Sequence, residues 1–420
     1  MLEGRSSSEP AVTAAVVAAI LLLLVGTFLD VRVAILLSIV VILIEIIRQV
    51  WTRFGLRGVV YERRLAHDRI TWGEEIPMTI EVWNRKRLPL AWLRAEDAAS
   101  PGVVVRERPL AIGRHGQHVL RNAWTLAPFE RVTRHFNVGA DRRGVYELGP
   151  VRLSVGDLFA REAAAQERDK VESFLVRPRT VPAPALHRRD TWGGLDRSLA
   201  GLTEDPSRFA GIREYAPGDS PRRIHPRASA RLGRPVVKRF EPSREREVLL
   251  AIDVQLGDRR AWEPVSDSEA VESLFVVAAS LARSLALERA AFGVAAAGYH
   301  GGGRRLALLP IAEAPGQAER ALDLLARLSS HPFSPFEDVL GMLLRVIRPG
   351  TTMLVLTARD PSAYVSHLRR FERAGCQVVV IACGRAGETD AARARTAGLT
   401  ARSARLDGPW RTAEHLAMSR

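Results

Sequence analysis

The chain has 420 residues, 47% of them hydrophobic, and a formal net charge of +14. This length suits one membrane element plus two soluble domains, and the hydrophobic share lets each soluble domain bury a core. The two cysteines, Cys376 and Cys383, exclude a disulfide framework beyond a single bond. Both flank the apolar run QVVVIA, so we expect buried, reduced thiols there.

Positive charge is concentrated in one part of the chain. Segment 208–246 holds 11 Lys+Arg against 4 Asp+Glu, so its net charge of +7 is half of the total. A net positive charge permits anionic partners such as nucleic acid, lipid head groups or acidic proteins. A partner site is therefore best sought in this segment.

Two apolar runs follow an N-terminal tail, residues 1–10. Residues 11–29 contain no charge, and residues 33–51 are apolar over most of their length. A helix needs roughly 20 apolar residues to cross the hydrocarbon core of a bilayer. We therefore predict a transmembrane helical hairpin over 11–51. A cleaved signal peptide is disfavoured because the start lacks a basic cluster and the apolar stretch continues into a second span.

Arginines near the second span predict its orientation. The turn between the spans has one arginine, offset by Asp30, whereas five arginines crowd the exit of the second span: Arg48, Arg53, Arg57, Arg63 and Arg64. Basic residues favour the cytoplasmic side. We expect a multi-pass protein of the plasma or inner membrane whose soluble domains are cytoplasmic, which agrees with reduced cysteines.

Residues 56–178 show the period-two alternation of half-buried strands. It is clearest in IPMTIEVWN at 76–84, and LAWLRAED and HVLRNAWTL read as further strands. Short strands separated by Gly, Pro and Asn clusters predict an antiparallel β-sandwich-like domain. Three histidines of this region lie on different expected faces, so no metal site is predicted from them: His115, His118 and His135.

Residues 248–420 alternate apolar strands with helical patterns. VLLAIDV at 248–254 is a buried strand, and a capping box at 266–269 opens a helix. Two strands joined through 299–303 form a hairpin, and helices and strands then alternate to the C-terminus. This order predicts a doubly wound, mostly parallel α/β sheet with one antiparallel edge. Glycines 301–303 lack the lysine and hydroxyl of a phosphate-binding loop, so they read as a turn.

Between these domains, residues 179–247 combine a proline-rich linker with the basic segment. The motif there resembles that of domain-of-unknown-function family 58, membrane proteins linked to MoxR-type AAA+ ATPases. The matching residues of its R-x-Y-x-P-G-D, R-x-I and small-Ala-Arg parts are Arg213, Tyr215, Pro217, Gly218, Asp219, Arg223, Ile224, Ser229, Ala230 and Arg231. The resemblance extends to the two spans, to an RG-x-Y-x-LGP stretch at 143–150, and to a von Willebrand A-like C-terminal domain.

Two departures from the family pattern matter. Pro226 stands where the family usually has tryptophan, so an aromatic contact is missing. Metal-binding von Willebrand A domains also carry D-x-S-x-S after the first strand, whereas this chain keeps Asp253 but has Gln255 and Gly257 at the serine positions. We expect no functional divalent metal there. Asp253 would instead cap a helix or pair with Arg259 or Arg260, and Asp360 would approach the same sheet edge.

The signature segment admits three interpretations. Asp219 could pair with Arg213 or Arg223 in an internal network that braces the fold, or the segment could dock an acidic protein. Nucleic acid is the third, although aromatics are sparse for base stacking. We find no nucleophile–base pair, no paired carboxylates, no metal-ligand spacing and no cofactor motif. The expected function is a non-enzymatic membrane-anchored scaffold that the resemblance associates with a MoxR-type ATPase. The alternative is anionic-ligand or nucleic-acid binding through 208–246.

Overall fold

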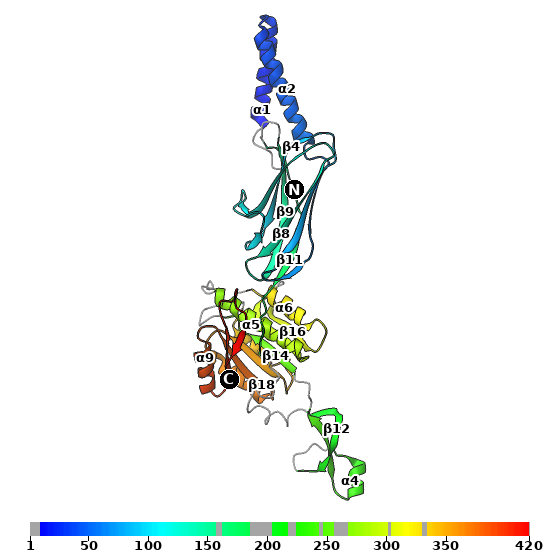
Figure 1. Cartoon of the computed structure of the whole chain (residues 1–420), viewed down its shortest axis with the longest axis vertical. Coiled ribbons are helices and arrows are strands. Elements are labelled where there is room, and N and C mark those ends of the chain that lie inside the picture. Colours follow the sequence, from blue (N-terminus) through cyan, green and yellow to red (C-terminus); the bar gives the residue numbers. More distant parts are fainter. Residues whose placement is uncertain are drawn as a thin grey trace. The chain divides into compact units, whose positions relative to one another are not determined.

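The computed structural model describes residues 9–156, 162–184, 204–216, 224–242, 247–255, 268–300, 304–329 and 334–419. They fall into two compact units. The first comprises the chain up to Asp141 together with Tyr146–Phe174, and the second comprises Arg142–Val145 together with Leu175–Arg420. Figure 1 traces the elements of both units along the chain.

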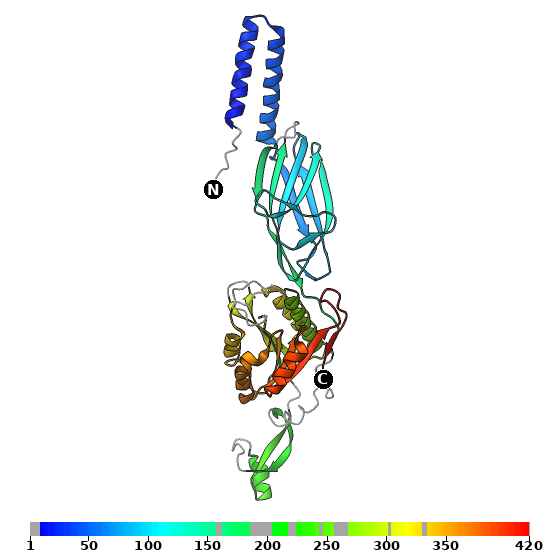
Figure 2. The same ribbon diagram turned by 90° about the vertical axis from the view of Figure 1, so that its left-hand side faces the viewer.

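Helices α1 (Glu9–Phe28) and α2 (Arg32–Phe54) form a hairpin and pack side by side (Figure 2). Gly26 permits their close approach, because a Cβ there would lie 3.1 Å from the Cβ of Ala34. Helix α2, with a mean hydropathy of 2.5, is long and apolar enough to cross a membrane, and almost none of it is covered by protein. Helix α2 is therefore a candidate membrane span, whereas the described apolar part of α1, Val17–Phe28, is a shorter apolar helix.

Two sheets make up the strand-rich unit. One has the order β1-β3-β8-β5: β1 (Val59–Leu65), β3 (Ile76–Asn84), β8 (Arg131–Ala140) and β5 (Val103–Val105). The other has the order β2-β11-β9-β4-β7-β6, with β10 beside β9: β2 (Arg69–Thr71), β11 (Glu172–Arg177), β9 (Gly144–Gly156), β4 (Leu90–Ala99), β7 (His118–Leu126), β6 (Ala111–Ile112) and β10 (Glu162–Arg168). Strands β3 and β7 have the predicted bounds. Strand β9 is the longest of these, with 13 residues.

A buried ionic cluster joins the two sheets. Arg63 of β1, 1% exposed, pairs with Asp97 of β4, which also accepts from the Tyr61 hydroxyl. Nη2 of Arg63 donates to the Leu148 carbonyl oxygen of β9 at 2.6 Å. Arg63 was expected to flank the membrane span. The structure corrects this, because its charge is enclosed in the core and neutralised there.

The second unit contains a mixed sheet of order β16-β15-β14-β17-β18-β19-β20: β16 (Arg304–Ala312), β15 (Ala291–His300), β14 (Glu247–Ile252), β17 (Thr352–Thr357), β18 (Gln377–Cys383), β19 (Thr400–Leu406) and β20 (Leu416–Met418). The five inner strands are parallel and both edge strands are antiparallel. The edge strand β16 was predicted from the hairpin. The second antiparallel edge, β20, is too short to show in the sequence pattern.

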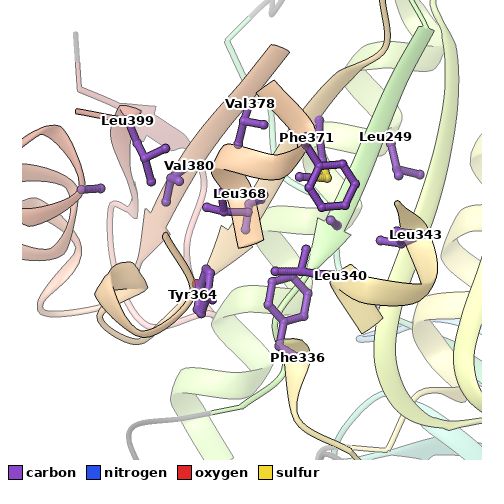
Figure 3. Close-up of a cluster of buried hydrophobic side chains, with 14 of the residues drawn as sticks. Leu249, Phe336, Leu340, Leu343, Tyr364, Leu368, Phe371, Val378, Val380 and Leu399 are labelled. Carbon is purple, nitrogen blue, oxygen red and sulfur yellow. The ribbon is translucent and has the colours of Figure 1, made fainter. Parts of the chain in front are cut away.

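Helices cover both faces of this sheet: α5 (Ser268–Leu287), α6 (Gln317–Arg327), α7 (Phe336–Leu343), α8 (Val365–Arg373, after a 3-10 turn at Pro361–Tyr364) and α9 (Gly387–Thr396). Helix α5 is buried on nearly all sides, which explains why its sequence also resembles a membrane span. Alternate strand residues form the opposite face with α7, α8 and α9, where Phe336, Tyr364 and Phe371 fill the core (Figure 3). Ser266 and Asp267 of the predicted capping box lie outside the described residues.

A small two-stranded element carries the family signature. Strand β12 (Glu204–Glu214) pairs antiparallel with β13 (Val236–Pro242), and the short helix α4 (Pro226–Leu232) lies between them in the chain. Of its residues with a described side-chain environment, only Val236 and Val237 are buried. We call this element the signature hairpin.

Candidate functional site

The helix of the signature hairpin is specified locally. His225 caps it, since its Nδ1 accepts from the Ala228 amide at 3.3 Å. Pro226 occupies the first turn, where a missing N–H costs nothing and a fixed φ suits the helix. Gly233 ends the helix in the left-handed conformation at φ 66°. Pro226, which replaces the family's tryptophan, therefore has a role in starting this helix.

Two signature residues, Ser229 and Ile224, hold the hairpin together. The Ser229 hydroxyl accepts from the Val236 amide at 3.0 Å, which ties α4 to β13. Ile224 forms an isolated antiparallel bridge with Val237. Ala230 and Arg231 lie on exposed positions of α4. Ser229 and Ile224 are thus structural, whereas Arg231 is presented to solvent.

The predicted Arg–Asp network involves Arg213, Asp219 and Arg223. Pro217, Gly218, Asp219 and Arg223 lie outside the described residues. Arg213 is exposed, and its Nη1 donates to the carbonyl oxygen of its neighbour Glu214 at 3.1 Å. That contact is local to β12, so it does not brace one element against another.

Large apolar side chains are exposed on the same hairpin. Ile212 is 43% exposed, Tyr215 36% and Leu232 48%. The same hairpin also carries four exposed arginines, Arg213, Arg227, Arg231 and Arg234, of which Arg234 pairs with Glu214. A small element that buries two valines and exposes three larger apolar groups among arginines has the composition of a binding surface.

A second candidate site lies at the carboxyl edge of the mixed sheet. Asp253 follows β14 directly, and its amide donates to the Leu356 carbonyl oxygen of β17 at 2.8 Å. From β14 the chain continues to β15 on one side and later to β17 on the other, so this is the switch point where open α/β sheets bind ligands. The carboxylate of Asp253 is fully buried.

Arg359, not Asp360, meets Asp253 at this edge. Nε of Arg359 donates to Oδ2 of Asp253 at 2.7 Å, and its Nη2 donates to Glu337 of α7 at 3.1 Å. The Thr357 hydroxyl also donates to Asp253, at 3.3 Å. Asp360 also follows β17 at this carboxyl edge, as expected, but its carboxylate bonds elsewhere. Its Oδ1 caps the following 3-10 turn by accepting from the Ser362 amide at 2.9 Å.

Burial controls the electrostatics of this cluster. Burial raises the pKa of Asp253 to about 6, although Arg359 favours its ionised form. Burial also disfavours the charge of Arg359, but Asp253 and Glu337 outweigh it and raise the pKa of the guanidinium. Arg359 is only 5% exposed and stacks over the Tyr364 ring at 5.0 Å from its centroid. Asp253 and Arg359 are therefore closed against solvent and paired with each other, while Glu337 is partly exposed.

The groups at this edge do not fit a divalent cation. A hard cation wants near-octahedral oxygen ligands, whereas here a guanidinium fills the space between the two carboxylates of Asp253 and Glu337. In the described parts of the chain, no three His, Cys, Asp or Glu side chains gather around a common point. Arg259 and Arg260, the partners expected for Asp253, lie outside the described residues. Sequence reasoning missed Arg359, although its place just after a parallel strand beside β14 was a usable signal.

The stretch 143–150 also has structural reasons for its residues. Arg143 is buried in the second unit, where its Nη1 donates to the carbonyl oxygens of Leu325 and Leu328 at 2.9 and 2.7 Å. Its guanidinium lies over the Phe275 ring and pairs with Glu272. Gly149 has φ 104°, and a Cβ there would collide with the carbonyl oxygen of Lys170. These residues have structural roles and leave no group free for chemistry.

Comparison with known proteins identifies one family model. Residues 211–382, which run from the signature hairpin to β18, match "Protein of unknown function DUF58". A relative, the uncharacterized protein YeaD of Bacillus subtilis, is 24% identical over 252 residues, which cover 58% of this chain and 57% of that protein. The chain thus aligns with little more than half the length of this relative.

Solved structures resemble only part of the chain. The CARDB domain of the PF1109 protein of Pyrococcus furiosus matches 28% of this chain and 89% of its own, at 15% identity and a TM-score of 0.19. A fragment of alpha-2-macroglobulin from Escherichia coli matches 29% of this chain and 17% of its own, at 20% identity and a TM-score of 0.22. Neither match covers as much as a third of this chain.

Proposed function

Because the chain belongs to the DUF58 family, we propose that it is a non-enzymatic, membrane-anchored adaptor that binds an acidic protein through the signature hairpin. The proposed partner is a MoxR-type AAA+ ATPase acting in complex assembly or maturation. The protein would span the membrane twice, with both units cytoplasmic, and its mixed-sheet unit would be von Willebrand A-like. The partner and this fold name rest on family resemblance, which is an associational warrant.

One observation carries the proposal. The signature hairpin exposes Ile212, Tyr215 and Leu232 among arginines. Aromatic and arginine side chains dominate the energetics of protein interfaces, because they bury large area and form directed hydrogen bonds. Cations around an apolar centre favour a partner whose matching surface is acidic.

The closed cluster at the sheet edge adds a condition. Arg359 occupies the place between carboxylates that a bridging cation would need. Docking by this chain is therefore proposed to be independent of divalent metal, and it should survive a chelator.

A binding experiment with the full chain in detergent tests the proposal. The immobilised chain is titrated with a purified MoxR-type ATPase from the same genome, with EDTA throughout. Loss of a central interface residue costs about 2 kcal/mol or more, roughly 30-fold in Kd. We expect such a loss for Tyr215→Ala and for Arg231→Glu. The exposed Arg373→Glu in α8 is the matched control and should bind normally.

The same assay separates the alternative function. Duplex or single-stranded nucleic acid replaces the ATPase, and salt is raised from 50 to 200 mM. Binding by phosphate contacts alone falls steeply with salt and ignores sequence. Salt-resistant, sequence-selective binding that Arg231→Glu abolishes would favour nucleic-acid recognition and contradict the adaptor proposal. Absence of ATPase binding by the wild-type chain would remove the proposed partner.

A further inference from the structure

Strand register places three loops at one end of the strand-rich unit. Val59 of β1 pairs with Asn84 of β3, and Trp83 pairs with Arg131 of β8. In the other sheet, Leu90 of β4 pairs with Leu126 of β7. Loops 55–58, 85–89 and 127–130 therefore lie together, at the end where α2 runs into β1.

Hydrogen bonds fasten these loops to the end of α2. Nζ of Lys86 donates to the carbonyl oxygen of Gly55, the residue that caps α2, at 2.8 Å. The amide of Arg85 donates to the Gly58 carbonyl oxygen at 2.8 Å, and the amide of Phe129 donates to the Lys86 carbonyl oxygen at 3.3 Å. Lys86 and Phe129, about 30 and 75 positions after Gly55 in the chain, thus lie near the end of α2.

These contacts assemble a basic collar, defined as Arg53, Arg57, Arg85, Lys86 and Arg87. The four arginines are exposed. Burial lowers the pKa of Lys86 to about 8, so it is still mostly charged at pH 7. Within loops 55–58, 85–89 and 127–130 the only carboxylate is Glu130, whose Oε2 accepts from the Ala127 amide of its own turn at 2.6 Å.

Phe129 is held outward beside this collar. Its side chain is 58% exposed, and its backbone has φ 59°. A bulky residue at positive φ is a genuine outlier, and such strain persists where surrounding contacts enforce it, often at functional sites. The neighbouring hydrogen bond to Lys86 provides such a contact. The result is an exposed aromatic side chain in loop 127–130, whose backbone is bonded to the Lys86 backbone of the collar.

We propose that the collar and Phe129 form a membrane-surface site, in which Phe129 inserts at the acyl boundary and the cations bind anionic lipid head groups. Aromatic side chains favour the membrane–water interface. Each Lys or Arg near an anionic leaflet contributes about 1 kcal/mol. The inference rests on the proposed membrane anchoring. It adds that the strand-rich unit itself contacts lipid, with a preference for anionic bilayers.

A bilayer is the occupant that the neighbouring helix favours. Helix α2 is almost entirely uncovered by protein and has a mean hydropathy of 2.5. The helix ends at Phe54, one residue before the Gly55 carbonyl that Lys86 binds, and Arg48 and Arg53 follow its apolar run on the approach to that end. A membrane that receives α2 would end beside the collar, so anionic head groups would be the nearest phosphate-bearing surface.

Fluorescence of a label at position 129 tests this contact. The full-length Phe129→Cys variant is labelled with NBD and placed in nanodiscs of phosphatidylcholine, with or without phosphatidylglycerol. Cys376 and Cys383 are buried, so the folded chain should label only at the new site. His115→Cys is the matched control. Residues 114–117 are exposed in the turn that connects the paired residues Ile112 and His118, at the end of the sheet opposite to the collar.

In anionic discs, lipids carrying a shallow doxyl group should quench the label at 129 at least twofold more than the label at 115. Arg85→Gln with Arg87→Gln should reduce that difference, and neutral lipid should reduce it too. Equal quenching at both positions in discs that contain the chain would overturn the lipid site while leaving the anchoring intact. A chain that fails to enter discs would overturn both the anchoring and this inference.

Discussion

Replacing Arg359 by alanine tests whether the sheet-edge cluster is a closed ion-pair site. The change leaves Asp253, fully buried, without its 2.7 Å partner and leaves Glu337 without its 3.1 Å contact. Removal of one partner from a buried pair costs about 3–5 kcal/mol, because an uncompensated charge remains. For a unit of this size that corresponds to roughly 6–20 °C in melting temperature.

The same variant should acquire a response to divalent cations. With the guanidinium gone, the carboxylates of Asp253 and Glu337 and the Thr357 hydroxyl surround a space of the right charge. A ligand at ten times its Kd stabilises the folded state by about 1.4 kcal/mol. Mn²⁺ or Ca²⁺ should therefore return roughly 3–6 °C to Arg359→Ala.

Thermal unfolding of the full chain in detergent, with EDTA or with 10 mM cation, measures both effects. The exposed Arg385→Ala, which follows β18, is the matched control and should melt like the wild type. The double variant Asp253→Ala with Arg359→Ala should lose the cation response. A wild-type chain that Mn²⁺ specifically stabilises, or an Arg359→Ala variant that melts normally and ignores cations, would refute the idea that Arg359 stands in a cation's place.

Three further changes probe other buried groups. Burial raises the pKa of the Cys383 thiol to about 12 and also raises the pKa of Cys376. An alkylating reagent at pH 8 should therefore modify both thiols only after unfolding. Rapid labelling of the folded chain would contradict this. Arg143→Met removes a buried ion pair with Glu272 and two hydrogen bonds to carbonyl oxygens, and should lower stability by about 3–5 kcal/mol in chemical denaturation. A loss under about 1 kcal/mol would show the pair to be dispensable. Gly149→Ala should cost more than about 1 kcal/mol, since φ 104° strains any Cβ, and an unchanged denaturation midpoint would show that the turn relaxes.

Local periodicity predicted most elements because each one is decided by its own residues. The alternation in IPMTIEVWN reproduces the burial pattern of β3, and the apolar runs of β14, β17 and β18 match strands buried on both faces. The short edge strand β20 could not be found this way. Its three residues carry no period, and it exists because β19 offers an unpaired edge.

Charges were harder to predict than strands, because their partners are distant in sequence. Arg63 reads as a membrane-flanking arginine, but Asp97 lies 34 residues away and encloses it in the core. Asp253 and Arg359 are separated by 106 residues, and only the order of strands in the sheet brings them together. The sequence therefore shows which side chains are charged, whereas only the topology of the sheets shows which side chains pair with them.

The two candidate sites differ in solvent exposure: the sheet edge holds a buried ion pair, whereas the signature hairpin exposes its apolar side chains. At the switch point of the mixed sheet, where open α/β folds usually receive ligands, the side chains of Arg359, Asp253 and Glu337 satisfy one another. A partner that docked there would first have to break a buried ion pair, at several kcal/mol. The signature hairpin imposes no such cost, because Tyr215 and Leu232 are already exposed. We therefore infer that recognition belongs to the hairpin, while the sheet edge serves stability, and the variants of Tyr215 and Arg359 should separate these two roles.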